Sequence, residues 1–187
     1  MLGFIFFAYL VNYYFRIIAH VGNGKAGLPD VTEDLTDWLD FFFDAGKVAL
    51  LIVICAAPVF LAIVLTGRPI MDLYYKPREV LPWALLSVGY LPAAILTVVI
   101  SESAGGALWP PAWVQIMVRL GRNYLTLIGL FVSTMVLLVL WHRFFYVRMP
   151  LFLGVWIESS ADVLLIFLQA VLFGGFLHKH AEALGFN

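Results

Sequence analysis

Residues 124–141, YLTLIGLFVSTMVLLVLW, form a run of 18 residues without a charged side chain, and this run decides the class of fold. A transmembrane α-helix needs about 20 predominantly apolar residues to cross the hydrocarbon core of a bilayer. Basic side chains follow the run directly, at His142, Arg143 and Arg148. The run is therefore predicted to be a membrane-spanning helix with a basic flank.

The composition of the whole chain supports the same class. Of its 187 residues, 63% are hydrophobic and 12% are charged, and the mean hydropathy is +0.97. An average soluble domain is about 45–50% apolar and about 25% charged. We predict an all-α, polytopic integral membrane protein, a single helical membrane domain over residues 1–187, with the lipid bilayer as its surroundings. The net charge of −1 gives no overall reason to expect nucleic acid or an anionic surface as a partner.

Five apolar runs are long enough to serve as spans, about residues 2–21, 45–66, 80–100, 124–141 and 151–177. The first run lacks the basic n-region and small-residue cleavage site of a signal peptide, so we predict a retained span, with a truncated start left open. Pro58 in the second run and Pro92 in the third should kink their helices. Basic residues number five on one side of these spans and six on the other, which leaves the orientation open.

Three polar side chains in the second half of the first span share one helical face. Asn12, Arg16 and His20 are spaced i, i+4 and i+8. One interpretation places the arginine and the histidine at the water interface. The other makes them part of a polar seam that faces protein and pairs with an acid of another span.

Two acids in the fifth run are the natural partners for such a seam. Glu158 and Asp162 are four residues apart and share a face. An ionised acid at mid-bilayer costs about 3 kcal/mol on insertion scales. The helix is therefore predicted to begin before Glu158, to bring Asp162 to the hydrocarbon, and to turn this face toward protein. The candidate partners are Arg16, Arg119 and Arg122.

Two amphipathic segments are predicted to lie at the membrane interface, at about residues 32–43 and 112–123. The glycines at Gly22 and Gly24 should end the first span ahead of residues 32–43, TEDLTDWLDFFF. Acids fill one side of this first segment, and they are either a solvated face or a strip for docking a basic partner. The candidate docking strip comprises Glu33, Asp34, Asp37, Trp38, Asp40 and Asp44. Residues 101–113 between the third span and the second segment are expected to form a loop.

Motifs for chemistry are absent from the sequence. His178 and His180 form a weak pair without the third ligand that zinc requires, and the single cysteine, Cys55, lies in an apolar run as a small hydrophobe. Phosphate-loop, zincin and nucleophile-elbow patterns do not occur. We therefore expect no enzyme, no catalytic residue, no metal and no cofactor.

Two groups of short motifs resemble those of a family of bacterial and archaeal polytopic membrane proteins defined by a domain of unknown function. In that family a helix is followed by a glycine and acid turn, a Leu-Pro and an Asp-Trp before the next span. The matching positions are 14–18, Gly22-Asn23-Gly24, Leu28-Pro29, Asp37-Trp38, Gly46 and Pro58, with 175–177, His180 and 184–186 at the closing end. The resemblance implies a membrane protein and no particular activity.

Two functions follow as hypotheses. The first is a non-catalytic accessory or scaffold subunit of a larger membrane complex, in the bacterial inner membrane, that packs against other integral membrane proteins through small-residue and aromatic faces. The second is a small transporter or lipid-handling protein that uses kinked second and third spans and a cavity lined by Arg16, Glu158 and Asp162.

Overall fold

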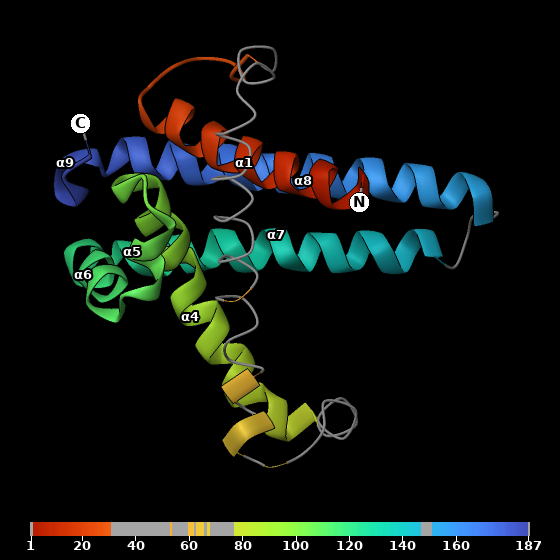
Figure 1. Ribbon diagram of the computed structural model, residues 1–187, viewed down its shortest axis with the longest axis horizontal. Coiled ribbons are helices and arrows are strands. Elements are labelled where there is room, and N and C mark those ends of the chain that lie inside the picture. Colours follow the sequence, from red (N-terminus) through yellow and green to blue (C-terminus); the bar gives the residue numbers. More distant parts are fainter. Residues whose placement is uncertain are drawn as a thin grey trace. The chain divides into compact units, whose positions relative to one another are not determined.

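The computed structural model describes residues 2–30, 53, 60, 61, 63–65, 67, 77–146 and 151–186, and the regular elements of this part are helices without a strand (Figure 1). The chain divides into two compact units, one formed by residues 1–12 and 32–119 and the other by residues 13–31 and 120–187. The helices are α1 (Leu2–Gly22), α4 (Pro77–Ser101), α5 (Ala104–Leu108), α6 (Pro110–Leu120), α7 (Asn123–Tyr146), α8 (Leu151–Lys179) and α9 (Ala181–Leu184).

Three of the described helices are long and apolar enough to cross a membrane. The windows are Leu81–Ser101 of α4, Asn123–Phe144 of α7 and Ser159–Lys179 of α8, of 21, 22 and 21 residues. At 1.5 Å per residue each window is about 32 Å long, which matches a hydrocarbon core of about 30 Å. These helices confirm the helical prediction for residues 80–100, 124–141 and 151–177.

The remaining predicted segments have different outcomes. Helix α1 has the bounds expected for the first run to within a residue, and its crossing of a membrane stays a prediction. The predicted segment 32–43 lies outside the described residues, and so does most of the predicted span 45–66.

The expected loop at residues 101–113 is wrong in part. The connection folds into α5, and α6 begins at Pro110, two residues before the predicted segment 112–123. Proline is tolerated in the first turn of a helix, because the N–H groups there have no intrahelical acceptor. Helix α6 ends at Leu120, and Gly121 follows with a left-handed φ of 51°. The position of α6 at a membrane interface stays a prediction.

In the first unit α4 runs as one helix through both Pro82 and Pro92, and Pro92 is fully buried. Helix α5 lies against the end of α4, since a Cβ built on Gly106 would come within 2.7 Å of the Ser101 hydroxyl. The ring of Tyr90 on α4 lies 5.8 Å from that of Trp113 on α6. Glycine is therefore what lets the short α5 turn back onto α4.

The second unit is a three-helix assembly closed by α9. Helices α7 and α8 run antiparallel, and residues 13–22 of α1 lie along α8 (Figure 1). The side chains at the centre of this unit are fully buried, namely Ile17, Ile18, Leu127, Phe173 and Leu177. The candidate functional site lies in this unit.

Candidate functional site

Small residues let α1 and α8 approach closely. A Cβ built on Gly174 of α8 would lie 2.6 Å from the Cβ of Val21 and 2.9 Å from the carbonyl oxygen of Ile18. Ala170, one turn earlier on α8, is fully buried. At the end of α1, a Cβ on Gly22 would lie 2.8 Å from Leu177 Cδ2. Close backbone approach at small residues is the usual basis of helix association in membranes, where lipid tails are as apolar as leucine.

A chain of hydrogen bonds then joins all three helices of the second unit. The Tyr14 hydroxyl of α1 donates to Gln169 Oε1 of α8 at 3.4 Å, and Gln169 Nε2 donates to Thr134 Oγ1 of α7 at 3.0 Å. The Thr134 hydroxyl lies 2.8 Å from the carbonyl oxygen of Phe131, to which it donates. The three side chains are 7%, 5% and 6% exposed. We call Tyr14, Gln169 and Thr134 the polar chain.

The polar chain fixes how the three helices register against one another. A buried amide or hydroxyl without a partner costs about 1–3 kcal/mol, so sliding one helix along another is unfavourable. Each interhelical hydrogen bond in a membrane contributes about 0.6 kcal/mol on average. The arrangement therefore suits positioning of helices.

One end of the unit is closed by the segment after α1. Gly24 has a φ of 73°, its N–H donates to the Val21 carbonyl at 2.9 Å, and the N–H of Lys25 donates to the His20 carbonyl at 3.2 Å. These bonds form a Schellman motif, as the glycines predicted. His178 Nδ1 of α8 lies 3.2 Å from the Gly22 carbonyl oxygen. The motif and the histidine together hold the end of α1 against α8.

The segment after α1 also contacts an earlier part of α1, at Tyr13. The Tyr13 hydroxyl donates to the Pro29 carbonyl at 2.9 Å, and the Tyr13 ring meets Phe167 of α8 edge-on with centroids 5.2 Å apart. The segment after α1 therefore folds back along the helix that precedes it.

The residues of the predicted polar seam lie on several elements. On α1, Asn12, Arg16 and His20 are half-buried. Helix α8 begins at Leu151, before Glu158, as predicted. Asp162 is half-buried inside the apolar window, and its Oδ1 atom is buried without a hydrogen-bond partner.

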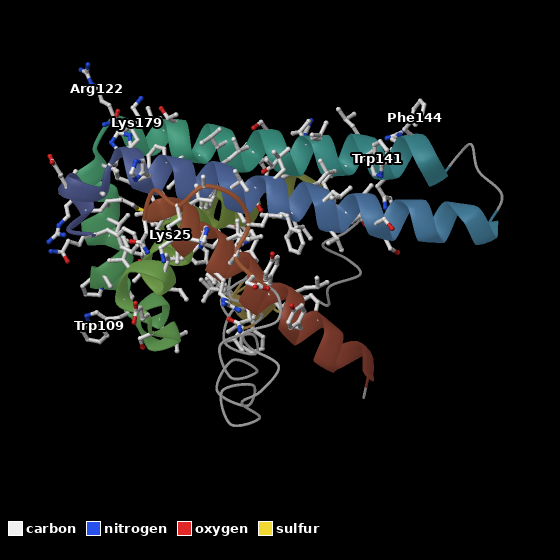
Figure 2. The ribbon with its side chains drawn as sticks, turned by 90° about the horizontal axis from the view of Figure 1, so that it is seen from above. Lys25, Trp109, Arg122, Trp141, Phe144 and Lys179 are labelled. Atoms are coloured by element: carbon white, nitrogen blue, oxygen red, sulfur yellow. The ribbon has the colours of Figure 1, made fainter. Side chains whose placement is uncertain are left out.

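The structure does not bring Asp162 to Arg122. Thr134 pairs with Gln169 in the antiparallel α7 and α8, so Asp162 lies near the level of Trp141. Arg122 and Lys179 lie together at the opposite end, which Figure 2 shows clearly. The 17 residues from Asp162 to Lys179 correspond to about 26 Å at 1.5 Å per residue. The proposed ion pair between Asp162 and Arg122 is therefore not formed.

Arg16 is the nearer of the proposed partners within this unit. Tyr14 pairs with Gln169, which places Arg16 near the level of Val171, nine residues from Asp162 or about 14 Å along α8. Arg119 is exposed on α6 and belongs to the other unit. The docking strip, Glu33, Asp34, Asp37, Trp38, Asp40 and Asp44, lies outside the described residues.

The roles of Gln169, Thr134 and Gly174 were not predicted from the sequence. A signal was present for Gln169, because an amide in the middle of the apolar run LLIFLQAVLF has no obvious place on a lipid-facing helix. The roles of Thr134 and Gly174 cannot be predicted without knowing which helices pack against each other. Gly174 is small because Ile18 and Val21 of α1 occupy the space beside it.

The described residues hold no group of three or more His, Cys, Asp or Glu side chains that could bind a metal ion. His178 faces the carbonyl of Gly22, and the ring of His180 lies 4.5 Å from Phe176. Comparisons with protein-family models, with curated proteins and with solved structures gave no match. The described part of the chain defines the class, a helical protein with three described helices that are long and apolar enough to cross a membrane. The family resemblance of the motifs stays a prediction.

Proposed function

We propose that the protein is a non-catalytic accessory or scaffold subunit of a larger membrane complex in the bacterial inner membrane, and that it works by packing against other membrane proteins. The second unit turns its polar chain and its closest small-residue contacts inward. Its outer surface is apolar, with large side chains that are 69% exposed at Leu125, 62% at Val139 and 68% at Leu164. Such a body supplies an apolar face on which another membrane protein can pack.

The observation that carries the proposal is the uncovered face of α7. Only 22% of its membrane window is buried inside the protein, against 47% for α4. Gly129 and Ser133 are both exposed on this helix and lie four residues apart, and no atom lies within 4 Å of a Cβ built on Gly129. Exposed small residues at this spacing admit the backbone of another helix. We take α7 as the contact helix for a partner.

Site-specific photocrosslinking in native membranes tests this function. A photoreactive residue at Val132, one turn from Gly129, should form an adduct with a distinct membrane protein. The variant Gly129→Leu should abolish that adduct while leaving the melting temperature within a few degrees, because the site has open space. Adducts with lipid alone at this position would contradict the proposal.

The second hypothesis, a small transporter or lipid-handling protein, is favoured by one observation, the buried Oδ1 of Asp162 without a hydrogen-bond partner. Ionisable side chains inside a membrane commonly line water-filled pathways. The test is the variant Leu165→Cys, made in a chain whose only native cysteine is removed by Cys55→Ala. If a water-filled cavity lies beside Asp162, a membrane-impermeant maleimide should label this variant. Unreactive Leu165→Cys, with reactive Lys179→Cys as the positive control, would count against a transport path.

A further inference from the structure

Three cationic side chains from distant parts of the sequence lie at one end of the second unit, with Arg122 and Lys179 side by side and Lys25 apart from them (Figure 2). Lys25 follows the end of α1, Arg122 precedes α7, and Lys179 is the last residue of α8, and all three are exposed. Gly24 lies against His178, which places Lys25 beside the end of α8. Figure 2 shows Arg122 and Lys179 next to each other at this end, opposite Trp141 and Phe144. We call Lys25, Arg122 and Lys179 the basic end.

These cations are not neutralised by the described part of the chain. None of the three forms an ion pair or a side-chain hydrogen bond with another described residue. One acid of α9, Glu182, is exposed nearby. Three cations against one acid leave an excess of positive charge, although the whole chain has a net charge of −1.

The basic end coincides with the edge of the apolar windows. The window of α7 begins at Asn123, directly after Arg122, and the window of α8 ends at Lys179. Lysine and arginine at such an edge reach the headgroup level while their aliphatic stems remain on apolar surface. The charges therefore lie where the phosphates of lipid headgroups lie.

The helix termini at this end are largely satisfied within the chain. At the start of α7, the N–H of Tyr124 donates to the Gly121 carbonyl at 3.1 Å and the N–H of Leu125 donates to the Arg122 carbonyl at 3.2 Å, so an anion would be held mainly by the cationic side chains. Helix α8 ends here with a negative partial charge, which Lys179 in its last turn offsets. The Schellman motif and the contact between Gly24 and His178 hold the backbone at Lys25 near the end of α8.

We propose that the basic end binds the phosphate of an anionic phospholipid headgroup. The site goes beyond the proposed role in a complex, because it needs no partner protein. It also fixes the orientation that the sequence leaves open, since anionic lipid is concentrated in the cytoplasmic leaflet. The basic end then faces the cytoplasm.

The test uses the full chain, delipidated in detergent, with bound lipid counted by native mass spectrometry. Phosphatidylglycerol and phosphatidylcholine with the same acyl chains are titrated separately, and inorganic phosphate is added as a competitor. We expect phosphatidylglycerol to bind at least tenfold more tightly than phosphatidylcholine, since each surface cation contributes about fivefold. Millimolar inorganic phosphate should displace little of it.

The triple variant Lys25→Gln, Arg122→Gln, Lys179→Gln should lose this preference, and Arg143→Gln, an exposed residue at the opposite end of α7, should keep it. Charge-retaining Arg122→Lys should also keep it, which separates loss of charge from loss of fold. Equal binding of the two lipids, or an unchanged preference in the triple variant, would overturn the proposal. Displacement by inorganic phosphate at the same affinity would overturn its assignment to lipid.

Discussion

Replacing Gly174 by alanine tests the packing of α1 against α8 with a single methyl group. The new Cβ would lie 2.6 Å from the Cβ of Val21 and 2.9 Å from the Ile18 carbonyl oxygen. Carbon atoms in contact are normally about 3.5–4.0 Å apart, so the helices must separate by about 1 Å. Neither neighbour can rotate away, because one is a Cβ and the other is backbone. Separation would also stretch the 3.4 Å bond between Tyr14 and Gln169.

The neighbouring glycine supplies a matched control for this variant. Gly175 lies on the same helix, is exposed, and has no atom within 4 Å of a built Cβ. Both replacements exchange glycine for alanine in a helix, so their gain in helix propensity, about 1 kcal/mol in water, cancels in the comparison. Overpacking a well-packed core costs about 1–3 kcal/mol. We therefore expect Gly174→Ala to be less stable than Gly175→Ala by about 1–3 kcal/mol.

The assay is reversible unfolding in mixed detergent and SDS micelles, followed by far-UV circular dichroism. Gly175→Ala should unfold at the same SDS fraction as the parent protein or at a higher one, and Gly174→Ala at a lower one. Equal unfolding free energies of the two variants would refute the close contact between α1 and α8. A stabilised Gly174→Ala would refute it more strongly.

Three further substitutions test the polar chain and the ends of helices, the first two by the same unfolding assay and the third by amide exchange. Gln169→Leu removes both interhelical bonds of the polar chain and should cost about 1–3 kcal/mol, whereas Gln115→Leu on the exposed face of α6 should be nearly neutral. Gly24→Ala and Gly27→Ala both place alanine at a positive φ, yet only Gly24 meets His178, so Gly24→Ala should be the more destabilising. Gly106→Ala should loosen α5 from α4 and expose Ser101 to faster amide exchange.

The described helices follow from the sequence because their lengths and apolar content are local properties. An uncharged run such as residues 124–141 has no stable alternative in a bilayer, where every backbone group must be satisfied within its segment. The start of α8 before Glu158 also follows, since the crossing would otherwise be too short. The start of α6 at Pro110 was not predicted, because proline ends most helices but is also suited to the first turn of one.

The candidate site depends on which helices pack against each other, and no local sequence pattern contains this information. Gln169 is 155 positions from Tyr14 and 35 from Thr134, and its bonds to these two residues explain why an amide is tolerated in the middle of α8. The basic end arises in the same way, from three cations that lie at or near the ends of three different helices. The sequence analysis grouped Arg122 with Asp162, because helical spacing shows which residues share a face but not which helix ends meet.

The most direct test of the proposed role is the mass of the particle that contains this chain when native membranes are solubilised with a lipid-preserving polymer. The chain alone has a mass of 21.0 kDa. We predict a larger particle in which mass spectrometry identifies at least one other integral membrane protein, and we predict that Gly129→Leu on α7 releases the chain from it. A particle that holds only this chain and lipid would contradict the account.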